Sequence, residues 1–216
     1  MRTLNAAHGF AVMVLLAALA GCGAAPQVHS SEEHQVISLK QGDLEAGGVA
    51  LITPSTVTGQ EEERQAVALT FARVLEKERP AIRVVTLAEA IGMINRAGLA
   101  DGYRRMYQEY RDTGIFLRDN LQRVGETTGA RYLAQLKLSG FQQESSGRLS
   151  VLGLRLIETK RATVRLYLQI WDANAGTVAW EGLQEMAYSE EQISEEQVTL
   201  RVVLTKASVE LVRRLP

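Results

Sequence analysis

Apolar runs alternate with amphipathic stretches in the part of the chain that follows residue 47. Residues 48–53 form a short apolar run ended by Pro54, which is typical of a buried strand. Residues 60–79 repeat apolar side chains at helical spacing, begin with three glutamates and end at Pro80. A second apolar run at 81–86 predicts another strand. The order strand, helix, strand favours a helix packed over a parallel part of a sheet.

The spacing of apolar residues changes from a helical period to a strand-like alternation near residue 130. Glycines and apolar spacing before that point predict helices at 87–96, 101–110 and 115–127. After it, apolar and polar residues alternate, which predicts strands at 131–141, 163–172 and 177–188. Ser194 and Gln197 form a capping box that opens a last helix over 194–214.

These elements predict the α/β fold class and a single domain at residues 48–216. Its core is a mixed β-sheet, with a parallel part and an antiparallel meander, covered by helices. Residues 142–162 interrupt the alternation with a polar turn and then an apolar arm. The arm is barely long enough for a membrane-spanning strand and its partner is too polar. We therefore expect a long strand or an excursion that packs on the domain or on a neighbouring subunit, with membrane insertion as the alternative.

The N-terminus has the features of an export signal. Arg2 is followed by an apolar stretch at 10–19, which is too short to span a bilayer as a helix. Leu19-Ala20-Gly21-Cys22 then resembles the lipobox of bacterial lipoproteins. The resemblance implies that residues 1–21 are a signal peptide, that cleavage falls between Gly21 and Cys22, and that Cys22 is the lipidation site, carrying acyl chains that anchor the protein to a membrane.

Two further expectations follow from this N-terminus. Gly23 stands where the enterobacterial sorting pattern has an Asp for retention in the inner membrane, so the resemblance implies the outer membrane, with the protein facing the periplasm. Residues 23–47 mix Gly, Ser, Gln and charges, and together with Cys22 they are predicted to form a lipidated, flexible tether at 22–47. A short edge strand at 36–39 would shorten its reach.

A family resemblance spans about residues 48–214. The strand at 48–54, the long first helix, the segment 129–134 that opens a strand, and the hairpin at 167–181 together resemble the CsgG-like family. That family includes the curli-secretion lipoprotein, lipoprotein activators of penicillin-binding proteins and the similar N-terminal domain of the Tol-system β-propeller protein. The resemblance implies assembly and protein contact at the outer membrane. The curli channel protein has two amphipathic hairpins per subunit, whereas this chain has room for at most one.

Composition argues against catalysis and against nucleic-acid binding. The 216-residue chain has a formal net charge of −1, which provides no electrostatic footprint for nucleic acid. Cys22 is the only cysteine, and the histidines are His8 in the signal and His29 and His34 in the expected tether. A folded domain without His or Cys cannot build a Ser-His-Asp triad or the usual zinc site, so we expect no enzyme, no metal, no cofactor and no small-molecule substrate. The glutamate clusters at 61–63 and 190–196 are expected to be solvated charges at helix starts.

Two segments are candidates for a partner surface. Tyr103, Tyr107 and Tyr110 lie at helical spacing beside Arg104, and tyrosine and arginine are enriched at protein interfaces. The same stripe is also typical of a helix face packed on its own core. Leu152 and Leu154 in the apolar arm are the second candidate.

The resulting hypothesis is a lipid-anchored adaptor or regulator of an envelope machine that contacts the membrane through its lipid and binds an envelope protein partner. The alternative is an oligomeric secretion or pore component of the outer membrane, in which copies of the chain associate with one another.

Overall fold

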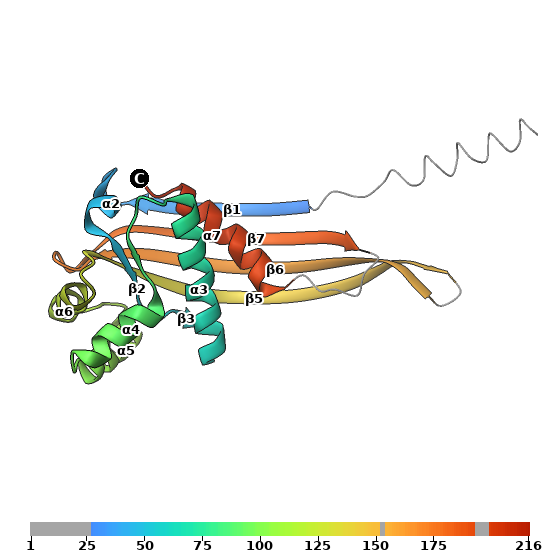
Figure 1. Cartoon of the computed structure of the whole chain (residues 1–216). Coiled ribbons are helices and arrows are strands. Elements are labelled where there is room, and N and C mark those ends of the chain that lie inside the picture. Colours follow the sequence, from blue (N-terminus) through green and yellow to red (C-terminus); the bar gives the residue numbers. More distant parts are fainter. Residues whose placement is uncertain (1–26, 152–153, 193–198) are drawn as a thin grey trace, which may run out of the picture.

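The computed structural model describes residues 27–151, 154–192 and 199–216, and it confirms a single mixed α/β domain (Figure 1). Within these residues an open seven-stranded sheet has the order β1-β7-β6-β5-β2-β4, with β3 paired to β5. The strands are β1 (Gln27–Val36), β2 (Val49–Leu51), β3 (Ser55–Thr56), β4 (Val84–Val85), β5 (Tyr132–Val151), β6 (Leu154–Asp172) and β7 (Thr177–Gln192). The helices are α2 (Asp43–Gly47), α3 (Glu61–Glu78), α4 (Leu87–Arg96), α5 (Ala100–Thr113), α6 (Arg118–Thr128) and α7 (Leu200–Arg213).

Helices cover both faces of the sheet at one end. Alternation along β6 directs Val164, Leu166 and Leu168 to the face that α3 and α7 cover, where a large apolar core forms. A second, smaller core lies on the other face under α4, α5 and α6, around Phe116 and Leu133. β2 runs parallel to both β4 and β5, whereas β5, β6, β7 and β1 form an antiparallel series. The predicted combination of parallel and antiparallel parts is therefore present.

The expected tether is the main departure from the prediction. Residues 27–36 form β1, which pairs with β7 over its whole length, and Asp43–Gly47 form α2. Leu39 and Leu44 are buried in the core. Most of the segment predicted as a flexible tether is therefore part of the folded domain, because backbone hydrogen bonds to β7 hold it even though every β1 side chain is exposed.

The second departure is the length of the central hairpin. Residues 142–162, expected as a polar turn followed by a long strand or an excursion, continue β5 and β6 as an antiparallel pair up to Val151 opposite Leu154. Figure 1 shows this end of the sheet running past the helices as a long arm. Register shifts near Gly140 and near Leu149 break the alternation that sequence analysis relies on. The predicted last helix is described only from Leu200, and the capping box of Ser194 and Gln197 lies outside the described residues.

An ion pair between half-exposed Arg131 and buried Asp172 lies at the opposite end of the sheet. Asp172 accepts hydrogen bonds from Arg131, at 2.7 and 3.1 Å, and from the backbone N–H groups of Asn174 and Ala175. Burial alone would raise the pKa of Asp172, but these hydrogen bonds outweigh it, so the pKa lies below the ordinary value. Gly176 completes the turn at a φ of 73°, and a side chain there would overlap Arg118.

This pair predicts an acid-sensitive contribution to stability. Because the folded-state pKa of Asp172 is depressed, its contribution is present above the unfolded pKa of about 3.9 and is lost as the pH falls through the folded-state value. Asp172→Asn should lower the free energy of unfolding at pH 7 by about 1–2 kcal/mol, since Arg131 is half-exposed. Urea unfolding at pH 7 and pH 3 should show a smaller pH difference for the variant. Equal pH differences would contradict this account.

Candidate functional site

The tyrosine stripe of α5 faces the sheet. Met106 is fully buried, and the rings of Tyr107 and Tyr110 pack on Phe116 at centroid distances of 5.5 and 4.1 Å. Phe116 in turn contacts Trp171 of β6 at 5.2 Å. Helical spacing therefore places these aromatic side chains in one layer between α5 and the sheet, the arrangement that sequence analysis left open as the core alternative.

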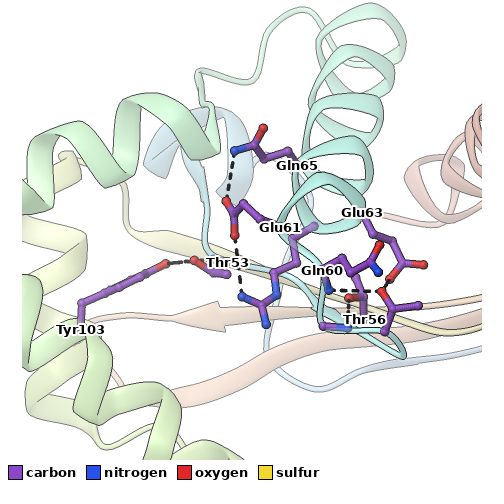
Figure 2. A network of polar contacts seen from close by, with 10 residues as sticks. Thr53, Thr56, Gln60, Glu61, Glu63, Gln65 and Tyr103 are labelled. Carbon is purple, nitrogen blue, oxygen red and sulfur yellow. Dashed lines mark hydrogen bonds and ion pairs between the residues drawn. The ribbon is translucent and has the colours of Figure 1, made fainter.

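The tyrosine hydroxyl groups form a polar chain under α5. The backbone N–H of Thr53 donates to the Tyr103 hydroxyl at 2.9 Å, and Figure 2 shows the ring reaching Thr53 from α5. Oη of Tyr103 lies 3.4 Å from Oη of Tyr107, which donates to Oε1 of Gln135 at 3.2 Å. Nε2 of Gln135 donates to Oγ of Ser55 at 3.4 Å. The chain therefore satisfies Gln135, a nearly fully buried amide in the middle of β5.

A second polar network continues across β6 and β7. Tyr110 donates to Oε1 of Gln169 at 3.3 Å, and Nε2 of Gln169 donates to Oε2 of Glu181 at 3.1 Å. Tyr167 donates a further hydrogen bond to the same Glu181 oxygen. This network lies on the sheet face opposite α3 and α7, beside the aromatic layer.

The pKa values of these tyrosines make them hydrogen-bond donors rather than bases. Burial raises the pKa of Tyr103, and it raises that of Tyr107 well above the ordinary value. Burial, with the Glu181 carboxylate, also raises the pKa of Tyr110 and of Tyr167. The phenols therefore stay protonated at neutral pH, and their arrangement supports positioning and packing rather than proton abstraction.

The hydroxyl chain predicts that removal of one tyrosine hydroxyl lowers the free energy of unfolding measurably. Tyr107→Phe leaves the buried Gln135 carbonyl without this donor, and an unsatisfied buried polar group costs about 1–3 kcal/mol. Urea unfolding should show this loss. Gln108→Ala on the exposed side of the same helix is the control and should change stability by less than about 0.5 kcal/mol. Equal effects of the two substitutions would show that the hydroxyl chain does not stabilise the domain.

A basic cleft opens where the tyrosine layer meets the start of α3. It has a volume of about 540 Å³ and is lined by Arg64, Arg111 and Lys137 together with the side of Tyr110. Gln65 donates to Glu61 at 3.1 Å, as Figure 2 shows. The Arg64 guanidinium lies 3.7 Å from the same carboxylate. The other two cations come from α5 and β5 and are exposed. Arg111 lies 3.9 Å from Asp112, so two of the three cations already have a carboxylate neighbour and the lining keeps only a partial excess of positive charge.

The first turn of α3 is held by its own loop. The Thr58 hydroxyl donates to Oε2 of Glu63 at 2.5 Å, and the N–H of Gln60 donates to Oγ1 of Thr58 at 3.2 Å. Glu63 and Gln60 are labelled in Figure 2. The Thr56 hydroxyl accepts from the N–H of Gly59 at 3.1 Å. The prediction that residues 61–63 are charges at a helix start agrees with this geometry, since all three glutamates lie in the first turn of α3.

The structure separates the predicted partner-surface residues. Arg104 is exposed and pairs with Asp101 on the surface of α5, whereas the three tyrosine side chains turn toward the sheet. Leu154 is the first residue of β6, at the far end of the hairpin, and Leu152 lies outside the described residues. Gly21 and Cys22 also lie outside them. The basic cleft is a feature that sequence analysis missed, because its cations come from three distant segments.

The structure corrects the predicted location of two histidines. His29 and His34 belong to β1 and not to a tether, and His34 stacks on Trp180 with a centroid distance of 6.3 Å. Within residues 27–151, 154–192 and 199–216, no group of three or more His, Cys, Asp or Glu residues could hold a metal ion. No helix in that part of the chain is long and apolar enough to cross a membrane.

Comparison with known proteins finds likeness in fold but no family match. No protein-family model and no curated protein matches the chain. Similar solved structures include the PelC dodecamer from Paraburkholderia phytofirmans, with a TM-score of 0.45 and 10% identity over 87% of this chain and 97% of that chain. Lipoprotein GNA1162 from Neisseria meningitidis has a TM-score of 0.42 and 14% identity over 77% of this chain and 98% of that chain.

The C-terminal domain of LpoB from Salmonella enterica is a further similar structure, with a TM-score of 0.36 and 16% identity over 64% of this chain and 82% of that chain. The structures with a similar fold therefore include bacterial lipoproteins. At these identities the likeness concerns the fold alone, and the CsgG-like resemblance stays a prediction.

Proposed function

We propose that this protein is a lipid-anchored adaptor of the bacterial envelope, held by acylated Cys22 at the periplasmic face of the outer membrane. In this proposal residues 1–21 are removed as a signal peptide, and the domain acts by binding a protein partner rather than by catalysis. The lipobox-like residues before Cys22 support the anchor. The CsgG-like resemblance supports a role in assembly.

The observation that carries the proposal is the place where the chain enters the sheet. β1 begins at Gln27, opposite Ser189 of β7, at the hairpin end of the domain. Ser189 lies opposite Arg161, and β6 continues from there for eleven residues to Asp172, which corresponds to about 36 Å at 3.3 Å per residue. An anchor at Cys22 therefore holds the hairpin end near the membrane and directs α4, α5 and α6 away from it (Figure 1).

In this orientation the end of the domain that carries α4, α5 and α6 faces away from the membrane and is available to the partner. The surface of α5 exposes Arg104, and the basic cleft at Arg111 and Lys137 opens beside the same helix. Only a few residues separate Cys22 from Gln27, and this short length limits how far the domain can move from the bilayer. We therefore place the partner contact on the α5 side, with an acidic segment of the partner suited to the basic cleft.

In-cell photo-cross-linking tests this function. A photoreactive residue in place of Arg104 should yield one discrete adduct with an envelope protein when the chain is anchored. The same probe in a Cys22→Ser background should lose that adduct, since the domain is no longer held at the membrane. An adduct that persists without the anchor, or the absence of any adduct from α5, would contradict the adaptor proposal.

One observation favours a second function, an oligomeric secretion or pore component. β5 and β6 run for 20 and 19 residues, well past the helices, and β5 pairs with β2 and β3 only between Tyr132 and Leu138. Its remaining edge could pair with another copy of the chain. Light scattering of the detergent-solubilised protein should then give a ring-sized mass, and Leu152→Asp or Leu154→Asp should give a folded monomer. A monomeric wild-type protein would exclude this function.

A further inference from the structure

An apolar groove lies between α3 and α4, the two helices that flank β4 along the chain. Its volume of about 270 Å³ is below the range of about 300–1,000 Å³ that is typical of small-molecule sites. Leu69 of α3 is 49% exposed and Ile91 of α4 is 41% exposed. The lining combines aliphatic side chains with three polar ones, and all belong to the continuously described residues 27–151: Glu61, Gln65, Ala68, Leu69, Thr86, Leu87, Ala88 and Ile91.

The two exposed aliphatic side chains lie outside the faces that the core buries. α3 turns Val67, Phe71 and several neighbours inward, and α4 buries Leu87, Ala90 and Ile94. Each helix is therefore apolar over a wider arc than its own domain covers. Single exposed aliphatic residues are common on protein surfaces, but here residues from two helices line one groove, which is typical of a site that contacts another molecule.

The charge of the groove is negative. Glu61 is the only charged residue of the lining. Glu89 adds a second carboxylate, because its Oε2 accepts hydrogen bonds from the N–H and the hydroxyl of Thr86, a lining residue, both at 2.9 Å. These hydrogen bonds lower the pKa of Glu89, so the group is ionised at neutral pH. Arg64 already lies 3.7 Å from Glu61, and Glu89 is therefore the carboxylate that a basic ligand group would neutralise.

We propose that this groove binds an amphipathic helix of an envelope protein, with aliphatic side chains against Leu69 and Ile91 and a lysine or arginine beside Glu89. This inference rests on the proposed adaptor function, which supplies a protein partner. A groove between two helices suits a third helix, because side chains that recur at i, i+3, i+4 and i+7 fill it along its length.

The groove and the basic cleft lie on neighbouring parts of the same helix. Arg64 lines the cleft, whereas Glu61 and Gln65, its neighbours in the first turns of α3, line the groove. The two sites differ in charge, so each suits a different segment of a partner. A partner that brings an acidic segment to the cleft and a basic amphipathic helix to the groove is held in one orientation.

Photo-cross-linking with identification of the attached peptide tests the groove on the full chain in cells. A photoreactive residue replaces Leu69, and mass spectrometry of the digested adduct gives the sequence of the attached segment. We expect a segment of another envelope protein that has aliphatic residues at helical spacing and a lysine or arginine among them. Protease resistance of each variant reports folding separately.

Substitutions in the groove should lower the yield of this adduct. Ile91→Asp should reduce it by about tenfold or more, because it buries an unpaired carboxylate against an aliphatic helix. Ile91→Ser is the second variant if the aspartate does not fold. Glu89→Gln keeps an oxygen acceptor for Thr86 but removes the charge, and it should also reduce the yield. Val202→Asp is the matched control, since Val202 is a 38% exposed aliphatic residue of α7, and it should leave the yield unchanged.

The outcomes separate the groove from the adaptor function. An attached segment that is acidic or lacks aliphatic residues would overturn the groove proposal, as would a yield that Ile91→Asp does not change. A cross-link to a second copy of the chain, or within the chain to residues outside the described ranges, would also overturn it. The Arg104 probe is measured in parallel. An adduct at position 104 with none at position 69 would overturn the groove and leave the adaptor function intact, whereas the absence of both adducts would overturn both.

Discussion

Phe116→Ala should lower the free energy of unfolding by about 3–5 kcal/mol. Phe116 is 1% exposed and contacts Tyr107, Tyr110 and Trp171, so its removal leaves a cavity at the centre of the aromatic layer. The layer lies between α5 and the sheet, and its loss should loosen the helices that the adaptor proposal assigns to partner binding. Urea unfolding followed by tryptophan fluorescence measures the loss, because Trp171 lies beside the missing ring.

Ile115→Ala is the matched control for this substitution. The adjacent side chain is 55% exposed, and its truncation should change the free energy of unfolding by less than about 0.5 kcal/mol. Similar losses for the two variants would show that the aromatic layer has no special role in holding α5 and α6. A loss below about 1 kcal/mol for Phe116→Ala would show that the cavity collapses without cost, contrary to the packing described.

Cys22→Ser should remove the protein from the outer membrane fraction. The change replaces the sulfur that the lipobox resemblance assigns to a thioether-linked diacylglycerol, so no acyl chain can be attached there. Two or more acyl chains hold a protein firmly at a membrane, and a chain that lacks them loses that anchor. Separation of inner and outer membranes and immunodetection of each fraction measure the effect.

Gly23→Asp is the control for localisation in an enterobacterial host. It leaves Cys22 intact and introduces the residue that the sorting pattern associates with the inner membrane. The protein should stay acylated but move from the outer to the inner membrane. A Cys22→Ser variant that still fractionates with the outer membrane would contradict lipid anchoring, and a Gly23→Asp variant that stays there would contradict the sorting expectation alone.

The sheet and its cores could be predicted where burial of one face makes apolar and polar residues alternate along the sequence. Val164, Leu166, Leu168 and Ile170 alternate along β6 because that strand has one face in the larger core. The sequence of β1 shows no such alternation, because all its side chains are exposed and its pairing depends on backbone hydrogen bonds to β7. The same absence of a period at the bulges near Gly140 and Leu149 concealed the full length of the hairpin.

The candidate site was predictable only in part. The spacing of Tyr103, Tyr107 and Tyr110 correctly placed them on one face of a helix, but it could not tell a core from a partner surface. What decides the matter is their hydroxyl partners, such as Gln135 and Gln169, which are 28 and 59 residues away in the sequence. Contacts across such distances depend on the complete sheet, so no local pattern could have shown them.

The most direct test of the proposed anchor is the mass of the N-terminal peptide of the protein extracted from membranes. We expect a peptide that begins at Cys22 and carries a diacylglyceryl group on sulfur and an acyl group on the amine. That result would support the anchor from which the orientation of the domain and the partner-facing side of α5 both follow. A peptide with an intact Gly21–Cys22 bond, or one that begins at Cys22 with a free thiol, would contradict it.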